Sequence, residues 1–218
     1  MGQVEPARYE ASLERVAAAF GHELGAASRD ALLAFVALVE RWNAKVNLTG
    51  ATGPEALCEV LLADAFALCS RELVPEAARV LDVGTGAGAP IVPLLVLRPD
   101  LSASCVEPLG KRATFLRTLS ARLGLLSRMT VLERRLDLER DAGKQLQDQG
   151  AFDVACSRAT FGPERWVPLG LALAPRVILL GASAEPPSPP EGARLLHTLR
   201  YQLPFSSAPR LCAVYLRG

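Results

Sequence analysis

The sequence predicts an α/β fold with a doubly wound, mostly parallel sheet of seven strands. From about residue 78 onward, short runs rich in β-branched residues alternate with helical runs. This alternation is typical of parallel strands joined by helical crossovers. The five predicted parallel strands are 79–83, 102–106, 129–132, 153–156 and 176–180. The helices predicted around them are 91–97, 111–123, 138–147 and 164–172.

The last two predicted strands, 199–203 and 211–216, have no helix between them. Only the short stretch from Pro204 to Pro209 separates them, so we expect an antiparallel hairpin that closes one edge of the sheet. The preceding stretch 181–190 is rich in proline, which is excluded from helix interiors and central strands. It is therefore predicted to be a surface loop.

Residues 1–75 are predicted to form an N-terminal helical extension, and residues 76–218 the α/β domain. Apolar residues recur at helical spacing in 9–24. A second helix is expected to begin with Ser28 as its N-cap, and a third near Pro54, because proline suits the first turn of a helix.

The overall charge of the chain is close to neutral, with 24 Lys and Arg against 23 Asp and Glu. A nucleic-acid partner would therefore need a local basic surface. The candidates for that surface are Arg41, Lys45, Lys111, Arg112, Arg134 and Arg135.

Five widely spaced cysteines fit neither a zinc site nor a disulfide framework, so we expect reduced thiols and no metal. The sequence has no signal peptide and no apolar run of the roughly 18 residues that a membrane span needs. We therefore expect a cytoplasmic protein without a membrane partner.

A glycine-rich loop, with Gly84, Gly86 and Gly88, follows the strand 79–83 and precedes a helical pattern. A strand, a glycine turn and a helix N-terminus together let a ligand approach backbone amides that point toward it. Read as G-x-G-x-x-A, the same loop also satisfies the dinucleotide fingerprint, and a lone match of that kind is a weak signal.

Two carboxylates near the loop bear on the choice of cofactor, and the first of them favours S-adenosylmethionine over a dinucleotide. Asp82, two residues before the first glycine, suits the ammonium group of a methionine-like ligand and would repel a pyrophosphate. Glu107, which follows the next strand, can accept hydrogen bonds from both ribose hydroxyls of either cofactor. A nicotinamide enzyme usually has a substantial catalytic domain after its first half, whereas only the hairpin follows here. The sequence therefore predicts a methyltransferase that uses S-adenosyl-L-methionine.

Four motifs then occur in a familiar order: WNAKVNLT (42–49), LDVGTGAGAP (81–90), EPLGKR (107–112) and SRA (157–159). Together they resemble the bacterial 16S rRNA guanine-N7 methyltransferases, also called glucose-inhibited division protein B. The resemblance covers the chain from about residue 32 to its end. It implies the class I methyltransferase fold and methyl transfer to a guanine N7 of 16S rRNA, in the small ribosomal subunit (30S particle). We expect a monomer.

The resemblance also implies roles for individual residues. The glycine loop would hold the cofactor, Leu136 and Asp137 would lie beside its adenine, and Arg158 would lie beside the methyl donor as the catalytic residue. The expected cofactor-binding residues are Asp82, Gly84, Thr85, Gly86, Gly88, Glu107, Leu136, Asp137 and Arg158. The expected substrate-binding residues are Asn43, Asn47, Lys111 and Arg112.

Alternatives remain at three of these positions. Asn43 and Asn47 suit helix-end caps as well as substrate contacts, and Arg158 could be a surface arginine in an ion pair. Guanine N7 carries a free lone pair, so no general base is required, and His22 and His197 are interpreted as incidental.

The chain departs from the family pattern on the substrate side. Of the family's His-x-x-Asp-Ser element only Asp64 is present, and the Lys-Gly after the fifth strand is Leu180-Gly181 here. The cofactor-side motifs are better kept than the residues expected to face RNA. Two alternatives are therefore a divergent paralogue that methylates a small molecule, and a cofactor-binding module without turnover.

Overall fold

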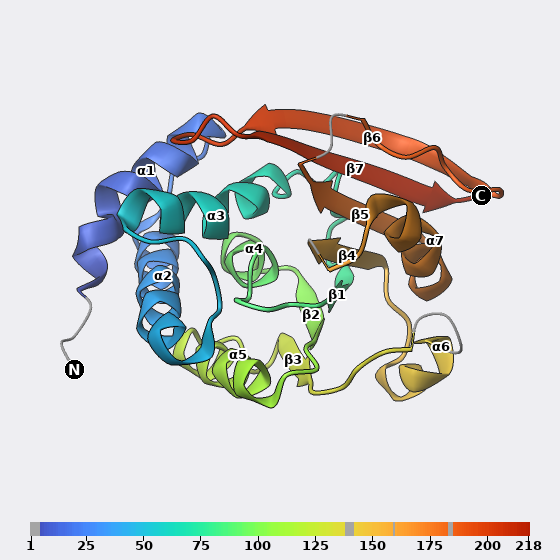
Figure 1. The fold of residues 1–218 in the computed structure, drawn as a ribbon, viewed down its shortest axis with the longest axis horizontal. Coiled ribbons are helices and arrows are strands. Elements are labelled where there is room, and N and C mark those ends of the chain that lie inside the picture. Colours follow the sequence, from blue (N-terminus) through green and yellow to red (C-terminus); the bar gives the residue numbers. More distant parts are fainter. Residues whose placement is uncertain (1–4, 138–141, 159, 183–184) are drawn as a thin grey trace.

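The structure is a computed structural model that describes residues 5–137, 142–158, 160–182 and 185–218. A curved seven-stranded sheet in the order β3-β2-β1-β4-β5-β7-β6 runs through the molecule (Figure 1). Helices α1 to α5 lie on one side of this sheet, and α6 and α7 lie on the other (Figure 1). The predicted doubly wound α/β fold is therefore confirmed.

The strands are β1 (Arg79–Val83), β2 (Ser102–Val106), β3 (Met129–Leu132), β4 (Val154–Arg158), β5 (Arg176–Gly181), β6 (Ala193–Gln202) and β7 (Pro209–Arg217). The helical elements are η1 (Pro6–Tyr9), α1 (Glu10–Ala19), α2 (Ala26–Val46), α3 (Pro54–Ala67), α4 (Ile91–Leu97), α5 (Gly110–Arg122), α6 (Ala142–Gln145), η2 (Gln147–Gln149) and α7 (Pro163–Leu173).

The strands β1 to β5 pair in parallel, and β7 pairs antiparallel with both β5 and β6. The predicted hairpin at the sheet edge is thus confirmed, but both of its strands are longer than predicted. The strand β6 begins six residues earlier than expected. It is an edge strand with many exposed residues, so its sequence lacks the apolar pattern from which its start could be predicted. The strand β4 also extends two residues beyond its predicted end, to Arg158.

Alternate residues of each strand feed two separate hydrophobic clusters. On β1, Val80 packs with the helices α1 to α5, whereas Leu81 and Val83 pack with α7 on the opposite face. The side chain of Asp82 consequently points to the same face as Val80, because strand side chains alternate. The two clusters bury both faces of the central strands, as a parallel sheet requires.

The N-terminal helices differ from the prediction at two ends. The first helix is shorter than 9–24, since α1 ends at Ala19 and Gly21 follows with φ +70°. The N-cap of α2 is Gly25, not Ser28: Gly25 is extended, and its carbonyl accepts the N–H of Arg29 at 3.0 Å. The helix α3 begins at Pro54 as predicted.

The helix α3 is tied to the turn between β6 and β7 by a buried carboxylate. Glu59 accepts hydrogen bonds from the backbone N–H groups of Phe205 and Ser206, at 2.6 and 2.9 Å, and from the Ser206 hydroxyl at 2.6 Å. The N-terminal helices and the C-terminal hairpin, distant in sequence, therefore share one face of the molecule (Figure 1).

The helix predicted at 138–147 is confirmed in part. The α-helix α6 spans Ala142–Gln145 and the 3-10 helix η2 begins at Gln147, whereas residues 138–141 lie outside the described part of the chain. Among residues 143–147 the buried apolar side chain is Leu146, one residue after α6 ends. Short helices depend mainly on such packing for their stability.

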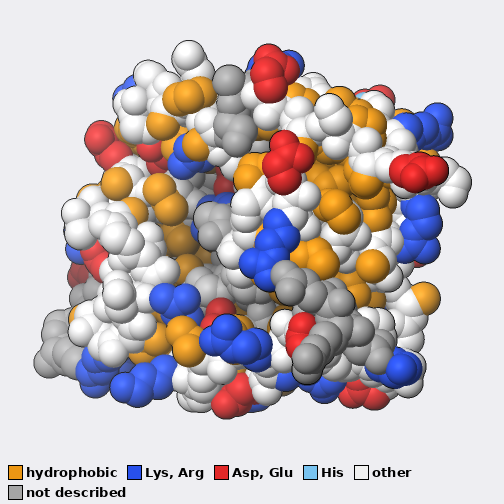
Figure 2. All heavy atoms as spheres, turned by 45° about the vertical axis from the view of Figure 1, so that its right-hand side comes forward, with side chains coloured by type: hydrophobic (Ala, Val, Ile, Leu, Met, Phe, Trp, Pro, Cys, Tyr) orange, Lys and Arg blue, Asp and Glu red, His pale blue; other side chains and the backbone are white. Residues whose placement is uncertain are grey.

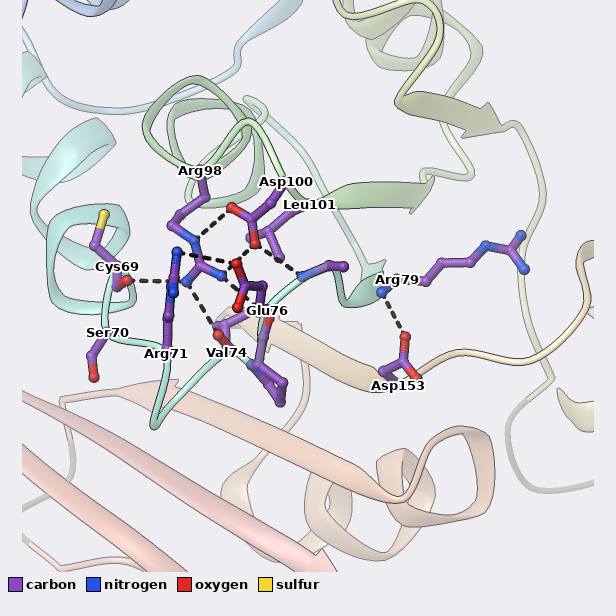
Figure 3. A network of polar contacts seen from close by, with 12 residues as sticks. Cys69, Ser70, Arg71, Val74, Glu76, Arg79, Arg98, Asp100, Leu101 and Asp153 are labelled. Atoms are coloured by element: carbon purple, nitrogen blue, oxygen red, sulfur yellow. Dashed lines mark hydrogen bonds and ion pairs between the residues drawn. The ribbon is translucent and has the colours of Figure 1, made fainter.

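The loop before β1 is held by the buried guanidinium of Arg98 (Figure 3). It donates to both carboxylate oxygens of Asp100, at 2.8 and 2.7 Å, and to the carbonyls of Cys69 and Val74, both at 3.1 Å. The same guanidinium holds the pKa of Asp100 well below its usual range. The network lies where β1 and β2 begin, at the opposite end of the strands from the glycine loop.

Replacing Arg98 with methionine is expected to reduce the free energy of unfolding by about 3–5 kcal/mol, because it leaves a carboxylate and several carbonyls without their donor. Chemical denaturation measures this loss. The matched control is Arg71→Met, since the Arg71 side chain is 67% exposed and pairs with Glu76. That surface pair contributes about 1 kcal/mol or less. Equal losses in the two variants would contradict the role assigned to Arg98.

No helix in the described part of the chain combines the length and the apolar character that crossing a lipid bilayer requires. Among the same residues, no three His, Cys, Asp or Glu side chains gather as a possible metal site. All five cysteines are free thiols, and burial raises the pKa of Cys58 and Cys212 to about 12.

Candidate active site

The glycine loop lies where the parallel strands β1 and β2 end. The backbone N–H groups of Gly84 and Thr85 both donate to the carbonyl of Val106, at 2.9 and 3.2 Å. The three glycines have φ values of +81°, +57° and +86°, a region in which side chains are strained. The loop is thus fixed to the end of β2 in a conformation that favours glycine.

The three glycines differ in what surrounds them. A Cβ atom on Gly84 would overlap the side chain of Thr160, and one on Gly88 would lie 3.0 Å from Val92. A Cβ atom on Gly86 would meet only the Gly84 carbonyl, at 3.8 Å. Packing inside the chain therefore explains why positions 84 and 88 are glycines. Gly86, in contrast, borders open space that a ligand can occupy.

Glu107 follows β2 directly and joins the glycine loop to the start of α5. Its carboxylate is buried, and it accepts the N–H of Gly86 at 2.9 Å on one oxygen and that of Leu109 at 3.0 Å on the other. Each carboxylate oxygen can accept a second hydrogen bond. The group is therefore oriented by the backbone and still able to bind a diol.

Asp82 on β1 is a buried carboxylate with an unused oxygen. Its Oδ1 accepts a hydrogen bond from the thiol of Cys156 at 3.3 Å, while its Oδ2 has no partner among the described residues. Thr85 donates from its hydroxyl to the Asp82 carbonyl at 3.2 Å. Burial raises the pKa of Asp82 to about 6. Since buried polar atoms are nearly always paired, the free oxygen fits a ligand that brings a donor or a cation.

Leu136 and Asp137 follow β3, which is the neighbour of β2 in the sheet. Leu136 is half-buried against the cluster on the α7 face, and Asp137 is exposed. The N–H of Asp137 donates to the side chain of Gln145 at 3.1 Å. Both residues therefore lie along the same sheet edge as Glu107, because the carboxyl ends of parallel strands meet there.

Arg158 is the last residue of β4. The sequence predicted a strand that ends at residue 156, with Arg158 beyond it, so this predicted placement of Arg158 is wrong. Its Nη1 donates to the carbonyl of Val60 at 2.6 Å and to Asp64 Oδ2 at 3.1 Å. Arg158 thus forms an ion pair, the alternative left open by the sequence, but its partner is a buried carboxylate of α3. No described residue accepts a hydrogen bond from Nε or Nη2 of Arg158.

A tyrosine completes this buried pair from the edge hairpin. The hydroxyl of Tyr201 on β6 donates to Asp64 Oδ1 at 2.6 Å. Burial, with the adjacent carboxylate, raises the pKa of Tyr201, so its hydroxyl keeps its proton. Asp64 therefore orients Arg158 while it is itself held in place by Tyr201.

A cavity of about 440 Å³ lies beside Arg158, at the carboxyl ends of β4 and β5. Its volume is in the range of ordinary small-molecule sites. It is lined by Glu59, Val60, Asp64, Arg158, Phe161, Pro163, Leu179, Leu180, Gly181, Ala182, Leu203 and Arg210. In open α/β sheets, ligands bind at this edge of the sheet.

Asn43 and Asn47 end the helix α2. The Asn43 side chain accepts the N–H groups of Leu48 and Thr49, at 2.6 and 2.9 Å, and donates to the carbonyl of Thr49 at 2.8 Å. Asn47 has φ +52°, the left-handed conformation common at helix ends. The structure thus shows the capping role, and a contact with substrate remains a prediction.

The predicted basic residues divide into separate places. Arg41, Lys45 and Lys111 line one groove, and Arg112 is tied to the end of α2 by a bond to the carbonyl of Asn47 at 2.9 Å. Arg134 pairs with Asp148 near α6, and Arg135 beside it is exposed. On the face drawn in Figure 2, Lys and Arg side chains gather along the lower edge and beside a hollow.

The chain, with its glycine loop, two buried carboxylates and cavity, can be compared with known proteins. The family model for rRNA small subunit methyltransferase G matches residues 28–167. The chain belongs to this family. A relative from Anaeromyxobacter dehalogenans (strain 2CP-C), named ribosomal RNA small subunit methyltransferase G, is 34% identical over 97% of this chain and 99% of its own. A relative of the same name from Myxococcus xanthus (strain DK1622) is 30% identical over 98% of this chain and all of its own.

Solved structures share the fold at low sequence identity. An O-methyltransferase from Bacillus cereus in complex with SAH aligns with a TM-score of 0.60 at 16% identity, over 96% of this chain and 99% of that one. TrmN from Thermus thermophilus aligns with a TM-score of 0.51 at 22% identity, over 71% of this chain and 48% of that one. These likenesses show the class I methyltransferase fold.

All the site residues predicted from the sequence lie inside the span that matches the family, between Asn43 and Arg158. Two residues that contribute to the Arg158 site from the hairpin, Tyr201 and Arg210, lie outside it. Sequence reasoning missed both, and it also missed Phe161. No local sequence pattern indicates that a residue of the C-terminal hairpin packs beside the end of a strand that is distant in sequence.

Proposed function

We propose that this protein transfers a methyl group from S-adenosyl-L-methionine to N7 of a guanine in the 16S rRNA of the small ribosomal subunit. One observation carries the proposal: a cofactor-type glycine loop with two buried carboxylates lies on the same sheet edge as a cavity beside Arg158 that is large enough for a base. Membership of the rRNA methyltransferase family supports the assignment of an RNA substrate.

The residues present fit the cofactor. Glu107 would accept the two ribose hydroxyls, the free Oδ2 of Asp82 would face the ammonium group, and Gly86 leaves room for close approach. Leu136 and Asp137 would lie beside the adenine at the end of β3. When bound, the cofactor supplies an electrophilic methyl group on a positively charged sulfur. Asp82 and Glu107 would hold the ammonium and ribose groups of the cofactor and so orient that methyl group toward the acceptor.

The cavity beside Arg158 fits a guanine. The purine presents N7 and O6 as neighbouring acceptors. The guanidinium group of an arginine can donate two parallel hydrogen bonds to such a base edge or to a phosphate. Arg158 has donors left after its bonds to Asp64 and Val60. Because N7 carries a lone pair and loses no proton, these residues need only align the base with the methyl group, and alignment supplies most of the rate effect.

The affinity for the cofactor is expected to depend on the protonation of Asp82. Because its pKa is about 6, a shift from pH 7 to pH 5 protonates the carboxylate and should weaken binding by roughly tenfold. Calorimetric titration at both pH values measures this. Asp82→Asn should bind weakly at both, and a pH dependence that persists in this variant would contradict the assignment.

The same carboxylate has a predictable effect on stability. Its folded-state pKa lies above the ordinary value of 3.8, so the folded protein binds the proton more tightly than the unfolded chain. Stability from this group is therefore fully present below about pH 4 and is lost as the pH rises to about 6. At pH 7, Asp82→Asn should be more stable than the parent protein without cofactor, by up to about 3 kcal/mol.

Incubation with methyl-labelled cofactor tests the proposed function. Purified 30S particles and protein-free 16S rRNA serve as acceptors, and borohydride and aniline treatment then cleaves RNA at N7-methylguanine. We expect label in one guanine of at least one of these acceptors. Transfer only to small metabolites would favour the small-molecule alternative, and cofactor binding without any transfer would favour the binding module.

A further inference from the structure

A groove of about 980 Å³ lies between α2 and α5, apart from the cavity beside Arg158. The start of α5 lies beside the end of α2, where Arg112 donates to the carbonyl of Asn47 at 2.9 Å. The groove is lined by Pro6, Ala34, Ala37, Leu38, Arg41, Trp42, Lys45, Val46, Lys111, Thr114, Thr118, Arg122 and Leu123.

The rim of this groove is strongly positive. Its charged residues are Arg41, Lys45, Lys111 and Arg122, all exposed, and no acidic residue is among those that line it. In the described parts of the chain none of the four cations forms an ion pair with a carboxylate. The whole chain has a net charge of +1, so the remainder of the protein is negative overall. The groove is therefore a local positive surface on an otherwise negative molecule, and it suits a polyanion.

The floor of the groove is apolar and contains an aromatic ring. Trp42 is half-buried, packs against Phe115 with ring centroids 5.5 Å apart, and lines the groove. Unpaired nucleotides stack their bases on such rings while their phosphates contact cations. An RNA duplex hides its bases and offers mainly its backbone, so an apolar floor favours an unpaired strand.

We propose that the groove between α2 and α5 binds an unpaired strand of the substrate RNA, with phosphates on the basic rim and a base on Trp42. The inference rests on the proposed function, because it takes RNA as the substrate. From Lys111 to Arg122 the helix rises roughly 16 Å, enough for several nucleotides. Lys111 lies four residues after Glu107, so this strand begins beside the cofactor site and leads away from it.

Intrinsic fluorescence locates the RNA directly. The protein has two tryptophans, and Trp166 is fully buried, so Trp42 alone can report on the groove. A mixed-sequence single-stranded oligoribonucleotide should quench the fluorescence, and a duplex of the same composition should quench it far less. Trp42→Phe should remove the quenching. Quenching that persists in Trp42→Phe, or that is equal for the duplex, would overturn the proposal.

Charge reversal gives a second test. Lys45→Glu and Lys111→Glu should each raise the Kd for the single strand about tenfold and reduce the slope of log K against log salt by roughly one unit. The matched control is Arg194→Glu, which makes the same charge change at an exposed position of β6. It should change the Kd less than twofold. Equal effects of all three variants would overturn the proposal, because they would reflect net charge alone.

Methyl transfer to 30S particles separates this inference from the proposed function. If both hold, Lys45→Glu lowers kcat/KM about tenfold while the Kd of the cofactor is unchanged. If the parent protein methylates RNA and Lys45→Glu is as active, the groove proposal fails and the proposed function stands. If the parent protein methylates no RNA, the proposed function fails, and the oligoribonucleotide titrations decide the groove on their own.

Discussion

Replacing Glu107 with glutamine is expected to weaken cofactor binding about 100-fold, which isothermal titration calorimetry measures directly. The glutamine has the same shape, but its amide nitrogen cannot accept a hydrogen bond from Gly86, Leu109 or a ribose hydroxyl. Hydrogen bonds to a charged group contribute about 1.5–3 kcal/mol each, so the loss of one or two of them accounts for this factor.

The matched control for this variant is Glu76→Gln, which also neutralises a carboxylate but lies in the loop before β1, with its side chain 62% exposed. Its affinity for the cofactor should equal that of the parent protein. Thermal denaturation of Glu107→Gln without cofactor shows whether the glycine loop still folds. Unchanged affinity in a folded Glu107→Gln would contradict the cofactor site proposed here.

Replacing Arg158 with lysine is expected to lower kcat for methyl transfer about 100-fold, while the Kd of the cofactor changes less than tenfold. Lysine keeps the positive charge beside Asp64 but loses the planar fork that can contact the acceptor. The loss of one preorganised donor at a reacting group has an effect of about 100-fold or more. Single-turnover kinetics with saturating cofactor measures the change.

Lysine is preferred to methionine at this position because methionine would leave the buried Asp64 carboxylate without a counter-ion, at a cost of about 3–5 kcal/mol in stability. The control is Tyr201→Phe, which removes only the second bond to Asp64. It should reduce stability by about 1 kcal/mol and change kcat less than tenfold. A folded Arg158→Lys with full activity would contradict a role for Arg158 in positioning the acceptor.

The bounds of β1, β2 and β3 could be predicted to the residue, because each short run of strand-forming residues is followed directly by a glycine or a glutamate, namely Gly84, Glu107 and Glu133. The strand β6 could not be predicted in the same way, since it is an exposed edge strand stabilised by pairing with β7. The helix predicted at 138–147 is present at Ala142–Gln145, and residues 138–141 lie outside the described part of the chain.

In the candidate site, too, some features could be predicted from the sequence and others could not. Asp82 and Glu107 could be placed together from the sequence, because they lie at the ends of consecutive parallel strands that must meet at one edge. The partners of Arg158 could not: Asp64 is 94 residues away from it, and Tyr201 is 137 residues from Asp64. These contacts depend on how α3 and the edge hairpin pack over the sheet, which no local pattern encodes.

The central claim is that this protein methylates a guanine N7 of 16S rRNA. Mapping N7-methylguanine in the 16S rRNA of cells with and without the gene tests it most directly. We predict that one methylated guanine disappears on deletion, returns with the parent gene, and does not return with Glu107→Gln. An identical methylation pattern in the presence and absence of the gene would contradict the claim.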